Sequence, residues 1–150
     1  MDPKFKNFYE TLGGIMPALK TRTLFISHAW HRDEHYQFVV TCFNNADNFS
    51  WRDCSVPSHD NCEETTNAGL KRCLTRQMSV SQGVIILAGM YAAHSDWIDY
   101  EIDEAVRMNK IILGLRPWGQ ERTPIKIQNA ATEMVNWNCA SIVEAVRRLI

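Results

Sequence analysis

The sequence predicts a single domain of the doubly wound α/β type, in which a mostly parallel central sheet has helices on both faces. Short apolar runs typical of buried strands alternate with amphipathic helical patterns four or five times along the chain. The chain has 150 residues, the usual size of one domain, and its 45% hydrophobic and 22% charged residues are typical of a globular protein. We expect residues 1–20 to form an N-terminal extension and residues 21–150 to form the domain.

The first half of the domain is expected to contain two strands and two helices. Residues 23–27 are apolar on both faces, as a central parallel strand should be. Asp33 is expected to cap a helix, because apolar residues recur after it at i, i+3, i+4 and i+7. A short strand over 49–51, a loop over 52–61 and a helix over 63–78 follow.

The second half is expected to add three strands, over residues 83–88, 111–115 and 133–137. After a loop over 89–94, Ser95 or Asp96 is predicted to cap a helix that ends at Asn109. A capping box, Ser141-x-x-Glu144, is predicted to open the last helix.

Parallel sheets of this type bind ligands beyond the carboxyl ends of their strands, near the point where the strand order reverses. The loops that should border such a crevice follow Ser27, Trp51, Ala88 and Leu115. A functional site is therefore expected among these four loops and the helices that they begin.

Charge and cysteine content restrict the partners and the compartment. Sixteen basic and seventeen acidic residues leave a net charge of −1, which does not favour a nucleic-acid partner. The longest apolar run is too short to cross a bilayer, and no signal peptide is recognisable, so no membrane partner is expected. Five cysteines without a CxxC pair predict free thiols and a cytoplasmic location.

Trp97 and Glu101 are the first candidates for chemistry. They are four residues apart, so on a helix they lie on one face, one turn from each other. This helix follows the strand over 83–88, so both side chains are expected at the ligand end of the sheet. The alternative is that Trp97 is core packing and Glu101 is a solvated charge favoured by the helix dipole.

Other polar residues follow the first two strands. Ser27, His28 and Trp30 end the first strand, but no nucleophile elbow surrounds the serine, which disfavours hydrolysis by a Ser-His pair. Asp53 ends the second strand, where it could bind a ribose hydroxyl or a cationic ring, or equally cap the loop.

Metal and phosphate-loop sites are not expected. Two sets of potential ligands have no standard zinc spacing, namely His28, His31 and His35, and Cys54, His59 and Cys62. The chain also has neither G-x-G-x-x-G nor G-K-[ST], which disfavours a dehydrogenase or a phosphate-loop NTPase.

At this point the sequence resembles TIR domains, and in particular the TIR-like proteins of bacterial Thoeris anti-phage systems. The residues that carry the resemblance are those of strand 24–30, of 51–57, of 84–87, of the W-x-x-x-E segment 95–102 and of 110–115. The W-x-x-x-E pattern is weak alone, but its place between a strand, a loop and a further strand makes it fairly specific. The resemblance implies the three-layer, flavodoxin-like fold of TIR domains.

The resemblance also implies an enzyme that cleaves the nicotinamide–ribose bond of NAD⁺, with NAD⁺ as a substrate and no separate cofactor. Glu101 would be catalytic, and Ser27, Trp30, Asp53 and Trp97 would line the nucleotide pocket. The ADP-ribose-derived product, linear, cyclic or conjugated, would activate a separate effector protein, and homo-oligomer formation is a further expectation. The alternatives are a non-enzymatic TIR-like interaction module and an enzyme similar to nucleoside deoxyribosyltransferases.

Overall fold

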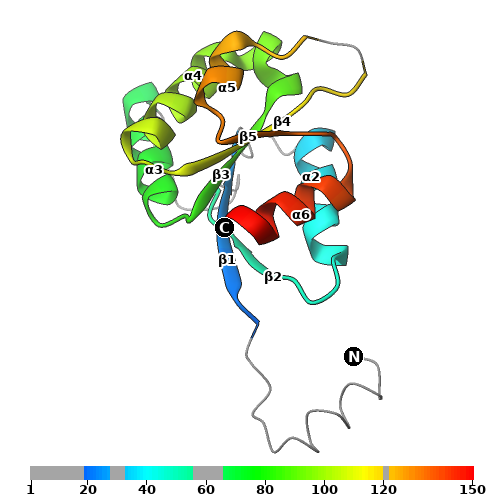
Figure 1. Cartoon of the computed structure of the whole chain (residues 1–150). Helices are drawn as coiled ribbons and strands as arrows, with labels where there is room; N and C mark the ends of the chain where they lie inside the picture. Colours follow the sequence, from blue (N-terminus) through cyan, green and yellow to red (C-terminus); the bar gives the residue numbers. More distant parts are fainter. Residues whose placement is uncertain (1–18, 28–32, 56–65, 120–121) are drawn as a thin grey trace, which may run out of the picture.

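The computed structural model describes residues 19–27, 33–55, 66–119 and 122–150 (Figure 1). Its strands are β1 (Thr21–Ile26), β2 (Ser50–Asp53), β3 (Gly83–Leu87), β4 (Ile111–Leu115) and β5 (Glu133–Val135). Its helices are α2 (Glu34–Asn45), α3 (Asn67–Ser79), α4 (Tyr91–Arg107), α5 (Ile125–Ala130) and α6 (Cys139–Leu149). A short 3₁₀ helix, η2 (Ala88–Met90), connects β3 to α4.

The described strands form one five-stranded parallel sheet in the order β2-β1-β3-β4-β5. This is the flavodoxin-like order of doubly wound folds, and it confirms the predicted fold class. The chain proceeds from β1 to β2 in one direction and then continues from β3 to β5 in the other. The order therefore reverses between β1 and β3, where such sheets open a crevice for ligands.

Two helical layers cover the sheet (Figure 1). We call the side with α2 and α6 the α2 face, and the side with α3, α4 and α5 the α4 face. Strand residues alternate between the two: Leu24 and Ile26 pack on the α2 face, whereas Phe25 packs on the α4 face. Both faces are buried, which explains why the central strands are continuously apolar.

The predicted cap of α2 is confirmed. The Asp33 carboxylate accepts a hydrogen bond of 2.9 Å from the backbone N–H of Tyr36, so it satisfies a donor in the first turn. Tyr36, Val39 and Phe43 of the predicted apolar stripe are buried against the sheet. The cap fixes the direction in which the chain leaves the ligand edge of the sheet.

The predicted start of α4 matches the part of the helix that follows its kink, and an additional turn precedes it. The helix begins at Tyr91, within the predicted loop over 89–94, and a kink at His94 (φ −138°, ψ 32°) divides it. The Tyr91 hydroxyl donates to the Asp99 carboxylate over 2.8 Å, which connects the turn before the kink to the helix after it. The predicted caps Ser95 and Asp96 therefore lie inside α4.

Two further boundaries differ from the prediction. Asn138 caps α6 by accepting a 2.8 Å hydrogen bond from Ser141 N–H, so the helix begins one turn before the predicted capping box. Glu144 instead binds Arg148 over 2.9 Å. Helix α5 was not predicted, because only Ile127 of its short segment is buried and the apolar periodicity is weak.

The prediction of free thiols is wrong for three of the four described cysteines. Cys42 on α2 and Cys139 at the start of α6 form a disulfide with their Cα atoms 5.0 Å apart. Cys73 is also disulfide-bonded, and Cys54 is a free, buried thiol. The two helices meet because they pack on the same face of the sheet. Since the two cysteines are 97 residues apart in the sequence, no local pattern indicated that contact.

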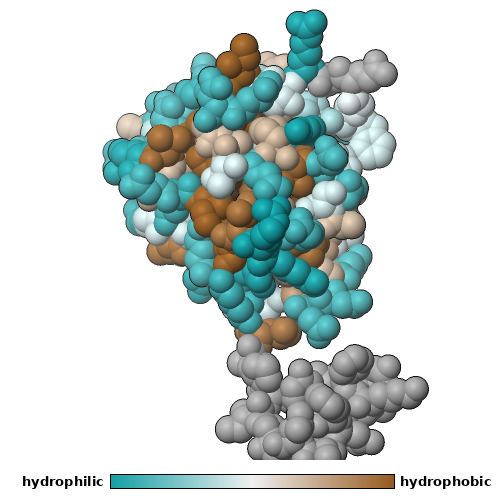
Figure 2. Space-filling model, in the orientation of Figure 1, coloured by the Kyte–Doolittle hydropathy of each residue, from teal (hydrophilic) through white to brown (hydrophobic). Residues whose placement is uncertain are grey.

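The surface is mixed in polarity. On the face shown in Figure 2, apolar side chains gather near the middle of the domain and hydrophilic ones surround them. Among the described residues, no helix has the length and apolar content required to cross a membrane.

Candidate active site

Glu101 is a fully buried carboxylate on α4. It lies among the buried apolar residues Ile98, Ile102 and Ala105 of the same helix. Glu101 also makes an interaction with another group of the protein. Transfer of a carboxylate out of water is costly unless hydrogen bonds or opposite charges compensate for it. The alternative interpretation of Glu101 as a solvated charge is therefore wrong.

Trp97 lies one helical turn before Glu101. Its half-buried ring packs against the apolar cluster of the α4 face, which contains Leu74, Ile98 and Ile102. The two side chains share one face of the helix, as their spacing predicted. The ring therefore contributes to the core, as the packing interpretation predicted, and its role in a nucleotide pocket stays a prediction.

A polar network holds α4 against α3 next to this pair. The Thr75 hydroxyl lies 2.5 Å from the Tyr100 hydroxyl and donates to the Glu104 carboxylate over 2.9 Å. Arg107 donates two hydrogen bonds to Glu104, of 2.9 and 2.7 Å, and these lower the pKa of that carboxyl. The network therefore joins α4 to α3 through residues that precede and follow Glu101 in the helix.

Ser27 joins β1 to β3 at the point where the strand order reverses. Its backbone N–H donates to the Ile85 carbonyl over 2.8 Å, and its buried hydroxyl oxygen accepts from Leu87 N–H over 2.9 Å. Ser27 therefore ties the end of β1 to β3 through its backbone and its side chain. Ser27 thus follows the carboxyl end of β1, whereas Trp97 and Glu101 lie on α4.

Asp53 belongs to the opposite side. One carboxylate oxygen accepts from the Tyr36 hydroxyl of α2 over 2.5 Å, and the other accepts from Ser55 N–H over 2.8 Å. Asp53 therefore stabilises the turn after β2 and ties it to the α2 face. The structure does not bring Asp53 together with Glu101, and its geometry matches the predicted loop-capping alternative.

Several predicted residues lie outside the described residues. These are Trp30, His28, His31, His59 and Cys62. Within the described part of the chain, no group of three or more potential ligands could hold a metal ion. Cys54 is an unsuitable nucleophile, because burial raises the pKa of its thiol and so disfavours the reactive thiolate.

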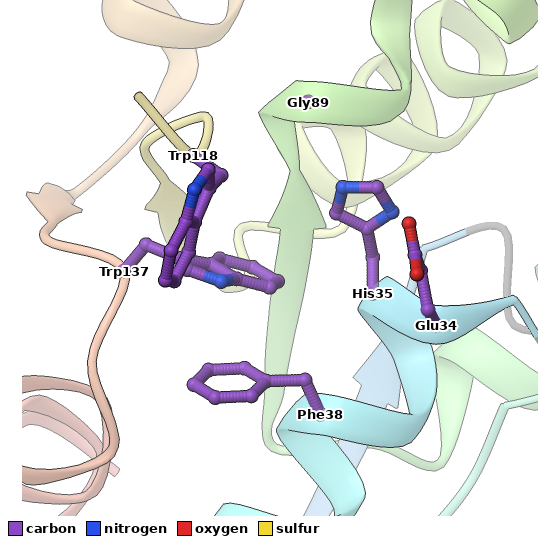
Figure 3. A pocket seen from close by; sticks show the side chains of 6 residues that line it. All are labelled: Glu34, His35, Phe38, Gly89, Trp118 and Trp137. Atoms are coloured by element: carbon purple, nitrogen blue, oxygen red, sulfur yellow. The ribbon is translucent and has the colours of Figure 1, made fainter. Parts of the chain in front are cut away.

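A cleft of about 570 Å³ lies where β3, β4 and β5 end, on the α2 face (Figure 3). We call it the aromatic cleft; the described residues that line it are Glu34, His35, Phe38, Gly89, Trp118 and Trp137. None of them was predicted as a site residue, although His35 was considered as a metal ligand. The loops after Ala88 and Leu115 were predicted to border the crevice. Trp118, just beyond Leu115, is the residue that could have indicated an aromatic cleft there.

The fold and the Trp97–Glu101 pair together define a class, that of TIR-like domains. The order β2-β1-β3-β4-β5 and a buried glutamate on the helix after β3, one turn beyond a tryptophan, are the features that carry this assignment. The chain matches the family described as Thoeris protein ThsB, TIR-like domain, over residues 25–122, and it belongs to that family. None of the curated proteins compared with the chain matches it.

Proposed function

We propose that this TIR-like protein cleaves the nicotinamide–ribose bond of NAD⁺ and releases an ADP-ribose-derived signal in anti-phage defence. The observation that carries the proposal is the full burial of Glu101 on α4. A leucine or methionine would pack at such a position without the desolvation penalty of a carboxylate. A buried carboxylate on the helix that follows the central strand β3 is thus better explained by chemistry than by packing.

Cleavage of the nicotinamide–ribose bond can be assisted by a carboxylate and does not require a strong acid beside it. Nicotinamide leaves as a neutral molecule from a cationic ring, so the leaving group needs no proton. Positive charge develops on the ribose as in glycoside cleavage, and the fixed Glu101 carboxylate would stabilise it. Trp97 would offer an aromatic face to the pyridinium or to a base.

The acceptor of the ribosyl group would decide the product. Water gives ADP-ribose, an internal nitrogen or hydroxyl gives a cyclic isomer, and another nucleophile gives a conjugate. NAD⁺ would be a substrate, and the product would act on a separate effector protein in the cytoplasm. The pocket-lining roles of Ser27, Trp30, Asp53 and Trp97, and homo-oligomer formation, are kept as predictions.

Two other functions compete with this proposal. A non-enzymatic TIR-like interaction module would not need the Glu101 carboxylate and would tolerate Glu101→Gln without loss of function. An enzyme similar to nucleoside deoxyribosyltransferases would act on free nucleosides instead of NAD⁺. Membership of the Thoeris ThsB family supports an anti-phage role more than the second alternative.

The test is to incubate the purified protein with NAD⁺ and to resolve the products by chromatography and mass spectrometry. Glu101→Gln keeps the shape of the side chain and removes its charge, so we expect it to lower turnover at least ~100-fold, as loss of one electrostatic stabiliser commonly does. Glu104→Gln is the matched control, because it neutralises another carboxylate of α4 that hydrogen-bonds to Thr75 and Arg107. It should keep most of the turnover.

The mass of the co-product separates hydrolysis or cyclisation from conjugation. If the lone protein is inactive, the assay is repeated in lysate from phage-infected cells, which would supply a missing activator. Release of nicotinamide at equal rates by the wild-type protein and Glu101→Gln would refute the role of Glu101. Absence of turnover in both settings would favour the interaction module.

A further inference from the structure

The aromatic cleft is a second candidate binding site, and its described lining includes none of the residues assigned to NAD⁺ cleavage. It lies on the α2 face, whereas Glu101 lies on α4, and its volume of about 570 Å³ is in the range of small-molecule pockets. We propose that the aromatic cleft binds a small planar organic cation, whose ring stacks on Trp118 and whose charge faces Glu34. The proposal does not depend on NAD⁺ cleavage.

One wall of the cleft is held in place by contacts between rings. Phe38 stacks on Trp137 with ring centroids 4.8 Å apart and an interplanar angle of 22°. His35 meets Trp137 edge-on, with centroids 5.5 Å apart. Because these side chains are already ordered by one another, a ligand would not have to immobilise them, which lowers the entropic cost of binding.

The ring of Trp118, which also lines the cleft, is mostly exposed to solvent. Trp118 is 70% exposed, and Figure 3 shows it across the cleft from His35. Gly119 follows with φ +82°, a left-handed conformation that glycine adopts without strain and that turns the chain just after Trp118. A tryptophan presented to solvent by a turn at the edge of a cleft is suited to stack on a flat ligand.

The charge around the cleft favours a cation. Glu34 is exposed in the first turn of α2 and lies beside His35 in Figure 3, and the Asp33 carboxylate is 3.7 Å from Nδ1 of His35. No lysine or arginine is among the described residues that line the cleft. Cations are attracted to the faces of aromatic rings, and tryptophan is the strongest partner. Carboxylates at the rim add to this attraction and would repel a phosphate.

Gly89 keeps the cleft open between its two walls. A Cβ atom built there would lie 3.5 Å from Nε2 of His35, which is an ordinary van der Waals contact. An alanine would therefore fit without displacing the backbone, and its methyl group would occupy part of the space next to the ring. Gly89→Ala is thus a variant that narrows the cleft without removing any contact.

The test is an NMR titration of the ¹⁵N-labelled full chain with 1-methylnicotinamide, a planar ring with a fixed positive charge. Nicotinamide is the control ligand, since it has almost the same shape and no charge. We expect the cation to shift the indole N–H signals of Trp118 and Trp137 among the five tryptophans, and to bind at least tenfold more tightly than the neutral ring. Equal affinity of both ligands, or shifts that leave these two signals unchanged, would overturn the proposal.

Substitutions in the cleft and outside it test where the cation binds. Trp118→Ala and Glu34→Gln change exposed side chains, so we expect both to stay folded, as the rest of the NMR spectrum will show, and to weaken binding of the cation at least tenfold. Gly89→Ala should weaken it as well. Glu144→Gln removes an exposed carboxylate on α6 and should have no effect, nor should Glu101→Gln. Loss of binding in Glu101→Gln with full binding in Trp118→Ala would refute the site.

Discussion

The two faces of the sheet contain carboxylates with different surroundings. On the α4 face, Glu101 is fully buried in a helix that a network of Thr75, Tyr100 and Glu104 holds in place. On the α2 face, Asp53 uses both oxygens to bind Tyr36 and Ser55. The predicted pocket had placed Glu101 and Asp53 together, whereas the structure places Glu101 on α4 and uses Asp53 to hold the turn after β2.

The faces also differ in what holds their helices. The disulfide between Cys42 and Cys139 joins α2 directly to α6, while side-chain hydrogen bonds join α3 to α4. A disulfide stabilises a protein mainly by reducing the conformational entropy of the unfolded chain, whereas side-chain hydrogen bonds stabilise the folded state. Substitutions on the two faces should therefore change stability by different amounts, and four experiments test this.

Removal of the disulfide should have the largest effect on stability. In the loop-entropy account, a cross-link that closes about 100 residues contributes up to ~4.7 kcal/mol. Cys139→Ser removes the bond at the exposed partner, so we expect a loss of several kcal/mol in urea denaturation under oxidising conditions. Cys42→Ser should lose at least as much, because Cys42 is also buried. A Cys139→Ser protein as stable as the wild type would show that the bond does not form.

Trp97→Ala should have the second-largest effect, a loss of about 3 kcal/mol in the free energy of unfolding. This is near the lower end of the range for truncation of a large aromatic side chain, because the ring is half-buried. Trp118→Ala is the matched control on the other face, where an exposed ring should contribute less than ~0.5 kcal/mol. Thermal and urea unfolding of both variants measure the difference. Equal losses would contradict the assignment of Trp97 to the packed α4 face.

Tyr36→Phe should destabilise the protein by about 1.5–3 kcal/mol, because a hydrogen bond to a carboxylate is lost without a change in shape. Asp53→Asn should have an effect of similar size. The two variants also separate the roles of Asp53. A raised KM for NAD⁺ in Asp53→Asn alone would support its predicted place in the nucleotide pocket, and an unchanged KM would leave it a structural residue.

The smallest effect should be the pH dependence contributed by Glu104. Arg107 holds the pKa of this carboxyl below its ordinary value of 4.5, so the unfolded chain binds the proton more readily than the folded protein. The stabilisation is complete above that ordinary value and is lost as the pH falls through the lower, folded pKa. Because Arg107 is mostly exposed, solvent screens the pair, and its contribution to stability should be small.

Urea denaturation of the wild type and Glu104→Gln between pH 6 and pH 3 checks this sign. The difference in stability between the two proteins should shrink towards low pH. A difference that stays constant or grows would show that the Arg107 contact does not depend on the charge of Glu104.

Most of the fold could be predicted from local patterns. The apolar run ending at Leu87 and the run from Ile111 to Leu115 matched buried strands, and the Asp33 cap opened the predicted helix. Such features depend on residues close in sequence, so propensity and periodicity report them. The turn of α4 before the kink at His94 was not predicted, because the Tyr91–Asp99 hydrogen bond that joins it to the rest forms only once the helix exists.

The site was predictable only in part. The spacing of Trp97 and Glu101 was enough to put them on one helical face, but the burial of Glu101 depends on how α4 packs against the sheet and α3. The aromatic cleft was missed because its residues come from the start of α2 and from the ends of three strands. The topology predicted that the loops after Ala88 and Leu115 meet, but nothing in the separate segments shows which of their rings line a cleft.

The sequence by itself determined the fold class, the family resemblance and the identity of the candidate carboxylate, because these depend on the order of apolar runs and on one helical spacing. Only the tertiary structure decided which carboxylate is buried, which cysteines are paired and which rings form a cleft. The physical reason is distance along the chain. Contacts such as Cys42–Cys139 are made by the packing of helices on a common face, and no local preference encodes them.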